Sequence, residues 1–133
     1  MNQNEARKNP RTIVIQKLYG HHLNKDSEIT FPKHRYKKFI KDVVNGTIER
    51  NELIQNLMDK KLKDDINENK TELMIKLMIM AAIYEFMFMH KTPVKVVINE
   101  YLKVADFFVE EPQKGFLNAI LEKVSKVSRT KNG

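Results

Sequence analysis

A long apolar run, Leu73 to Met89, constrains the fold of this chain more than any other feature. Lys76 and Glu85 interrupt the run, and it is short for a segment that crosses a membrane. A helix that is apolar nearly all round must be buried on every side by other elements. We therefore expect a central helix over about residues 71–89, with the rest of the chain packed around it.

Helical spacing of apolar residues also dominates outside this run, and no segment alternates as a half-buried strand does. A proline directly behind a capping residue is a typical start of a helix. Three pairs in the sequence predict such starts: Asn9-Pro10, Thr92-Pro93 and Glu111-Pro112. In the first half of the chain, helices fit about residues 10–24, 33–45 and 48–63. The second of these is expected to end at Asn45-Gly46, a typical stop signal.

The sequence therefore predicts an all-α protein. Its 133 residues are enough for one domain with one sizeable core, so we expect a single domain over residues 1–133. Residues 1–9 precede the first expected helix and are expected to form a flexible basic arm. Residues 128–133 follow the last apolar positions and are expected to form a frayed basic tail.

The net charge of +7 is concentrated at the start of the chain. Residues 1–38 hold nine Lys or Arg against three Asp or Glu, whereas residues 39–133 hold fifteen against fourteen. A basic segment on a nearly neutral body attracts polyanions, nucleic acid first and an anionic membrane second. The alternative is a solvated, lysine-rich surface that only maintains solubility.

The residue pattern does not indicate catalysis or a bound cofactor. No nucleophile–base pair or glycine-rich phosphate loop appears, and the chain has no cysteine, which suits a reducing cytoplasm. The histidines lack the spacing of metal ligands: they are His21, His22, His34 and His90. We therefore expect a cytoplasmic protein that is not an enzyme and binds no metal.

Arg7, Lys8 and Arg11 are the first candidates for contact with an anion. Arg7 and Lys8 lie on the expected arm, and Arg11 lies in the first turn of the helix that begins at Pro10. A phosphate at this helix start would meet free backbone N–H groups as well as the Arg11 guanidinium. The alternative is a disordered basic N-terminus without a partner.

Glu85 is the charged residue that is hardest to satisfy within the apolar run. Nine residues separate it from Lys76, which places the two on opposite faces of a helix, so they cannot pair. A buried carboxylate without a partner is costly, and such a group finds a partner or stays protonated. In the simplest interpretation, Glu85 is hydrogen-bonded inside the protein and ties two helices together.

The last expected helix carries a small polar and cationic strip on its outer face. Lys114 and Asn118 share this strip, away from the apolar arc of the same helix. Phe116 lies within the apolar arc, which favours core packing over the alternative of stacking on a splayed base. The strip is either a solvated surface or a place of contact.

Four short motifs stand out in the last third of the chain: Ile83-Tyr84-Glu85-Phe86, Lys91-Thr92-Pro93-Val94 with Ile98-Asn99-Glu100, Val104-Ala105-Asp106-Phe107, and Phe116-Leu117-Asn118-Ala119-Ile120-Leu121. Together these motifs resemble those of the NusB family, bacterial RNA-binding antitermination factors. Near the N-terminus, Arg11, Gln16 and Tyr19 match the family's Arg-x4-Gln-x2-Tyr pattern. The resemblance implies six or seven helices, packed as two perpendicular three-helix subdomains.

The resemblance also implies a function. It implies that the protein binds boxA-like single-stranded RNA together with NusE, a small-subunit ribosomal protein. The complex would travel with the RNA polymerase elongation complex and other Nus factors, and suppress premature termination, notably on ribosomal RNA operons. The implied RNA contacts are the N-terminal stretch with Gln16, and Lys114 and Asn118, with Phe116 as a further candidate. Glu85 and Tyr19 would face NusE.

Two positions depart from the family pattern. Met80 stands where the family usually has an arginine, and Ala119 stands where it has a glycine. One alternative function is a protein–protein adaptor that never touches RNA. Another is a stand-alone relative of the RNA-binding domain of RNA cytosine methyltransferases. A methyltransferase itself would also require a catalytic domain. The sequence leaves open whether the chain forms a homodimer.

Overall fold

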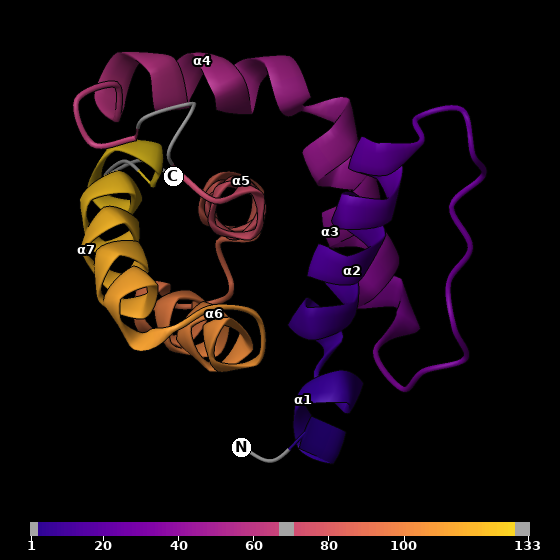
Figure 1. Ribbon diagram of the computed structural model, residues 1–133. Coiled ribbons are helices and arrows are strands. Elements are labelled where there is room, and N and C mark those ends of the chain that lie inside the picture. The colour runs from indigo at the N-terminus through magenta and orange to yellow at the C-terminus, as the bar shows by residue number, and fades with distance from the viewer. Residues whose placement is uncertain (1–2, 67–70, 130–133) are drawn as a thin grey trace.

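The computed structural model describes residues 3–66 and 71–129, and these residues form seven helices and no strand (Figure 1). The helices are α1 (Gln3–Lys8), α2 (Pro10–Leu23), α3 (Lys37–Glu49), α4 (Asn51–Lys61), α5 (Leu73–Phe88), α6 (Val94–Phe108) and α7 (Glu111–Ser128). The predicted all-α class is confirmed.

The apolar run forms the centre of the protein, as its composition predicts. α5 packs against α2, α3, α4, α6 and α7, and Figure 1 shows it end-on with the other helices around it. Ile79, Ile83 and Phe86 of α5 are fully buried. Burying one such side chain stabilises the fold by roughly 1.5–3 kcal/mol, so this helix supplies much of the core.

The helices form two groups of three, with α1 packed against α2 and α6. In the first group, α2 packs on α3 and α3 on α4, whereas in the second α5, α6 and α7 pack on one another. Figure 1 shows α2 and α3 to the right of α5, with α6 below it and α7 to its left. Because α5 contacts both groups, residues far apart in the sequence meet on its surface.

Local capping explains where three of the helices begin. The Asn9 side chain accepts a hydrogen bond from the Arg11 backbone N–H at 2.9 Å, and Pro10 is the first residue of α2. α7 begins at Glu111, one residue earlier than predicted, because Glu110 and not Glu111 is the N-cap and forms a capping box with Gln113. α6 begins one residue later than predicted, because Pro93 keeps an extended backbone and serves as its N-cap.

The predicted end of a helix at Asn45-Gly46 is wrong, because α3 continues through both residues to Glu49. Gly46 is buried, and a Cβ atom at this position would overlap the ring of Tyr84 on α5. The glycine therefore permits a close approach of two helices, and it does not mark a stop. An Asn-Gly pair looks the same in the sequence whether it ends a helix or permits a close approach of two helices, so only the packing distinguishes these two roles.

The structure also corrects the predicted arm and tail. Residues 3–8, expected to be a flexible arm, form the short helix α1, while residues 1–2 lie outside the described part. Ser128 still belongs to α7, and the Arg129 side chain donates hydrogen bonds to backbone carbonyls at the end of α5, among them that of Phe86. Residues 130–133 of the predicted tail lie outside the described part.

Candidate functional site

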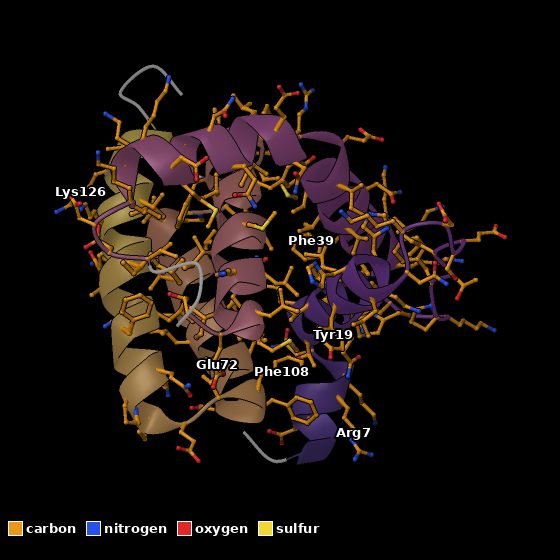
Figure 2. All side chains as sticks on the ribbon, turned by 45° about the horizontal axis from the view of Figure 1, so that its top comes forward. Arg7, Tyr19, Phe39, Glu72, Phe108 and Lys126 are labelled. Carbon is orange, nitrogen blue, oxygen red and sulfur yellow. The ribbon has the colours of Figure 1, made fainter. Side chains whose placement is uncertain are left out.

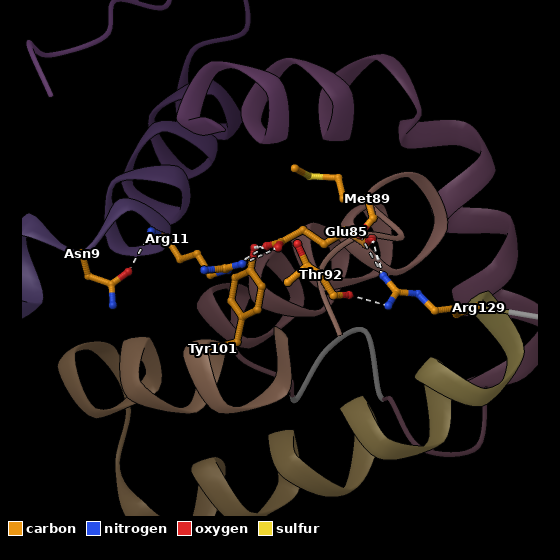
Figure 3. A network of polar contacts seen from close by, with 7 residues as sticks. All are labelled: Asn9, Arg11, Glu85, Met89, Thr92, Tyr101 and Arg129. Carbon is orange, nitrogen blue, oxygen red and sulfur yellow. Dashed lines mark hydrogen bonds and ion pairs between the residues drawn. The ribbon is translucent and has the colours of Figure 1, made fainter. Parts of the chain in front are cut away.

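Arg11 and Glu85 form a buried ion pair between α2 and α5 (Figure 3). Arg11 Nη2 lies 2.6 Å from Glu85 Oε1, and Arg11 Nε donates to Glu85 Oε2 at 2.9 Å. Two parallel hydrogen bonds are the geometry in which arginine binds a carboxylate most strongly. The Tyr101 hydroxyl of α6 donates to Oε2 at 2.5 Å. One carboxylate thus ties three helices together.

Burial and charge together set the protonation of this network. Glu85 is 0% exposed and Arg11 is 8% exposed. Burial alone would lower the pKa of Arg11, but the hydrogen bond and charge of Glu85 outweigh this effect and raise that pKa above its ordinary value. Burial, and then the charge of Glu85, raise the pKa of Tyr101 well above its ordinary value. Arg11 therefore stays charged, and Tyr101 stays a neutral donor.

This network corrects two of the predicted contacts. The Arg11 guanidinium, predicted to bind a phosphate, points inward to Glu85, and its Cζ lies 4.8 Å from the centroid of the Phe39 ring. Glu85, predicted to face NusE, has no exposed surface. Of the two interpretations of Glu85, the structure shows the internal one. No local pattern identifies Arg11 as its partner, because 74 residues separate them.

Four of the predicted contact residues are exposed on α1 and α2: Arg7, Lys8, Gln16 and Tyr19. Figure 2 shows the Arg7 side chain, from the last turn of α1, directed away from the body of the protein. His34 donates through Nε2 to the Lys8 carbonyl oxygen at 2.7 Å. The end of α1 is thereby tied to the segment that precedes α3.

The three candidates on α7 differ in how freely they are presented. Lys114 is half-buried, and its Nζ forms an ion pair at 2.7 Å with Oδ1 of Asp106 on α6. The hydrogen bond from this pair raises the pKa of Lys114. Phe116 packs partly buried against the core, as the simpler interpretation of its position predicts. Only Asn118 is exposed.

The N-terminal and C-terminal candidates lie on two sides of α6. This helix packs against α1, α2 and α7, whereas no contact joins α7 to α1 or α2 within the described ranges. The family resemblance implies RNA contacts at Arg7 and Lys8 as well as at Lys114 and Asn118. The structure brings these residues into two groups, and α6 borders both of them.

The structure also exposes a basic segment that the sequence did not single out. Its cations lie at the start of α3 and just before it: Lys33, Arg35, Lys37, Lys38 and Lys41. All but Lys41 fall within residues 1–38, where the charge excess is concentrated. The charge count was therefore the signal that could have found them, but the sequence does not show which cations share a surface.

A pocket of about 470 Å³ lies next to α2, between this helix, the α3–α4 corner and α5. Leu18 and His22 line it, and Tyr19, which is 38% exposed, lies between them in the sequence of α2. Met80, which replaces the arginine of the family pattern, also lines the pocket, where Gln55 donates to its sulfur at 3.7 Å. Tyr19 is thus an exposed aromatic residue of α2, on the flank next to the residues by which this helix lines the pocket.

The described residues contain no group of three or more His, Asp or Glu side chains that is arranged to hold a metal ion. None of the described helices has the length and apolar character needed to span a membrane. The features that the structure does show are a buried polar network and exposed cations on α1 and α3.

The fold and these surfaces define a small all-α domain, in which the polar network is internal and the exposed candidate residues lie on helix surfaces. Comparison with known proteins assigns the family. The model of the NusB family matches residues 5–126, and the chain belongs to this family. The resemblance inferred from the motifs is confirmed. Because this family is non-enzymatic, the expectation that the chain is not an enzyme is also confirmed.

Individual relatives and a solved structure agree with this assignment. The chain is 26% identical to the transcription antitermination protein NusB of Rickettsia massiliae over 121 residues, which cover 85% of this chain and 75% of the relative. It is 26% identical to the NusB protein of Caulobacter vibrioides over 116 residues, 87% of this chain and 78% of the relative. The T. maritima NusB structure has the same fold, with a TM-score of 0.80, 22% identity, and coverage of 95% and 94% of the two chains.

Proposed function

We propose that this protein is a transcription antitermination factor that binds boxA-like single-stranded RNA together with NusE. Membership of the NusB family is the observation that carries the proposal, because the relatives from R. massiliae and C. vibrioides are named as antitermination proteins. The protein would travel with RNA polymerase and other Nus factors in the cytoplasm. There it would suppress premature termination, notably on ribosomal RNA operons.

Exposed polar and cationic side chains support an RNA contact at the α1 end. Arg7 and Lys8 would bind phosphates, and Gln16 on α2 would hydrogen-bond the edge of an unpaired base. Asn118 on α7 lies on the other side of α6 and would contact a different part of the strand. Arg11 has an indirect role, because its ion pair anchors α2 to α5 and so positions α1. Lys114 contributes less charge than the sequence predicted, since Asp106 compensates it.

The double variant Arg7→Ala/Lys8→Ala is expected to bind boxA-like RNA more weakly than the wild type. Each phosphate contact contributes about 0.7 to the slope of log affinity against log salt for a single strand, so the slope should decrease in magnitude by about 1.4. Electrophoretic shift at several salt concentrations measures this change. Lys60→Ala/Lys61→Ala on α4 removes the same charge from exposed positions elsewhere and should leave the slope nearly unchanged. Equal losses in both variants would argue against a contact at α1.

A contact with NusE is best supported at Tyr19. Its ring is exposed on α2, and exposed aromatic side chains of this kind often dominate protein interfaces. Tyr19→Ala is expected to weaken NusE binding by about 2 kcal/mol, or roughly thirtyfold in Kd. Calorimetry with purified NusE measures this loss. Tyr36→Ala is the matched control, because Tyr36 is also exposed but precedes α3. An unchanged Kd for Tyr19→Ala would move the NusE surface elsewhere.

The alternatives predict different results for the wild type alone. A protein–protein adaptor would bind NusE but neither boxA-like nor scrambled RNA. A relative of the RNA-binding domain of RNA cytosine methyltransferases would bind RNA without any enhancement by NusE. RNA binding measured with and without NusE therefore separates the three functions, and stronger binding in the presence of NusE supports antitermination.

A further inference from the structure

The exposed face of α3 forms one wall of an open groove of about 620 Å³. Lys37, Lys38 and Lys41 line the groove from α3, and Tyr84 lines it from α5. Among the described residues, no ion pair neutralises any of these three lysines. We call this feature the α3 groove. Its cations lie outside the surfaces of α1, α2 and α7 discussed above.

The acidic side chain nearest the floor of the α3 groove is already engaged. The Tyr84 hydroxyl donates to Asp42 Oδ1 at 2.6 Å, so this carboxylate accepts a hydrogen bond within the protein. Burial, then this hydrogen bond, raise the pKa of Tyr84 to about 12, and the hydroxyl remains a donor at neutral pH. Gly46 leaves the space that the Tyr84 ring occupies. The Tyr84 ring is therefore held in place at the floor of the groove with 8% of its surface exposed, and Glu49 is the other acidic residue in the lining.

An exposed aromatic ring continues this floor beyond the lysines. Phe88 is 40% exposed, and its ring centroid lies 5.3 Å from that of Tyr84. The Arg50 Cζ lies 4.8 Å from the centroid of the Phe88 ring. Flat aromatic and guanidinium groups are the surfaces on which unpaired bases stack. The α3 groove thus has phosphate-binding side chains along its wall and stacking groups at one end.

The α3 groove is also connected to the RNA contact proposed at α1. His34 of the segment before α3 is hydrogen-bonded to the last residue of α1, Lys8, at 2.7 Å. The exposed cations Lys33 and Arg35 lie on either side of His34 in the sequence. Cations therefore continue from α1 to the start of α3, and a strand held at α1 has a favourable path along the groove.

We propose that the α3 groove is a second RNA contact, which binds nucleotides that flank those held at α1, with phosphates on Lys37, Lys38 and Lys41 and a base stacked beside Phe88. This inference rests on the proposed function, because it extends an RNA strand already bound at α1. An acidic protein segment would also be attracted by the lysines. RNA fits the surface better, because every nucleotide joins a phosphate to a flat base that can stack beside Phe88 and Arg50, whereas acidic side chains supply the charge alone.

The test compares two RNAs, a short boxA-like RNA and the same RNA extended by about eight nucleotides at each end, enough to follow α3 over its length of roughly 20 Å. The variant Lys37→Gln/Lys38→Gln/Lys41→Gln removes the lysines of the groove. Its matched control, Lys60→Gln/Lys61→Gln/Lys63→Gln, removes three exposed cations in and just after α4. Affinity is measured for each protein and each RNA at several salt concentrations.

The wild type should bind the extended RNA more tightly, with a salt slope steeper by about 2 than for the short RNA, because three more phosphates are neutralised. The α3 variant should lose this difference while it binds the short RNA as the wild type does, and the α4 control should keep it. Phe88→Leu keeps an apolar side chain but removes the ring. It should weaken binding of the extended RNA without changing the slope.

Other outcomes overturn the inference in ways that can be told apart. An α3 variant that keeps the wild-type preference for the extended RNA would show that the groove does not contact RNA. Equal losses in the α3 and α4 variants would indicate a general effect of charge. If a poly-glutamate peptide displaces the extended RNA as well as unlabelled RNA of equal charge does, the groove binds acidic protein segments. A wild type that binds neither RNA contradicts the proposed function itself.

Discussion

Replacing Arg11 with alanine is expected to lower the free energy of unfolding by about 3–5 kcal/mol. The substitution leaves the Glu85 carboxylate fully buried with the Tyr101 hydroxyl as its remaining hydrogen-bond donor in the network. An uncompensated buried charge is among the few causes of so large a loss. Urea denaturation followed by circular dichroism measures the change. A structural role for Arg11 also predicts that RNA affinity falls only as far as the folded fraction does.

Two companion variants distinguish the loss of the ion pair from the loss of packing. Arg11→Met/Glu85→Leu removes both charges and keeps apolar volume, so it should be more stable than Arg11→Ala. Tyr101→Phe removes one hydrogen bond from the same carboxylate and should cost about 1–3 kcal/mol. If Arg11→Ala instead unfolds like the wild type and loses RNA affinity, the guanidinium acts on RNA and the buried pair contributes little.

The parts of this fold that follow from local rules were predictable from the sequence. The apolar run had to be buried on all sides, and α5 is the central helix for that reason. Asn9-Pro10 predicted the start of α2, because the capping hydrogen bond depends on neighbouring residues alone. The sequence also showed that Glu85 needed a partner, since Lys76 lies on the opposite face of the same helix.

The parts that depend on tertiary packing were not predictable in the same way. Arg11 was predicted to bind a phosphate. Its actual partner, Glu85 of α5, lies 74 residues away in the sequence, so no local pattern pairs the two. Gly46 was predicted to end a helix. The glycine is needed because the ring of Tyr84, from another helix, fills the space of a Cβ atom. The sequence showed how many Lys and Arg residues the first 38 positions hold. Which of them share a surface on α1 or α3 depends on the arrangement of the helices.

Arg129 is another residue whose role depends on tertiary packing and was therefore not predictable from the sequence. Residues after the last apolar positions were expected to be frayed, but the Arg129 side chain donates four hydrogen bonds to backbone carbonyls at the end of α5 and just beyond it. The acceptors, with their distances, are Phe86 (2.9 Å), Glu85 (3.0 Å), Met89 (3.1 Å) and Thr92 (2.5 Å). A cation at this place also complements the negative end of the helix dipole.

Arg129→Ala is therefore expected to lower the free energy of unfolding by about 2–4 kcal/mol, because it removes four charge-assisted hydrogen bonds to carbonyls at the end of α5 and just beyond it. Denaturation in urea measures the loss, and Arg129→Lys should recover only part of it, since an ammonium group cannot reach all four acceptors. Lys126→Ala removes an exposed cation from the last turn of α7 and should change the stability by less than about 0.5 kcal/mol. Equal effects at the two positions would mean that Arg129 acts by charge alone, and that its contacts with α5 do not anchor the end of α7.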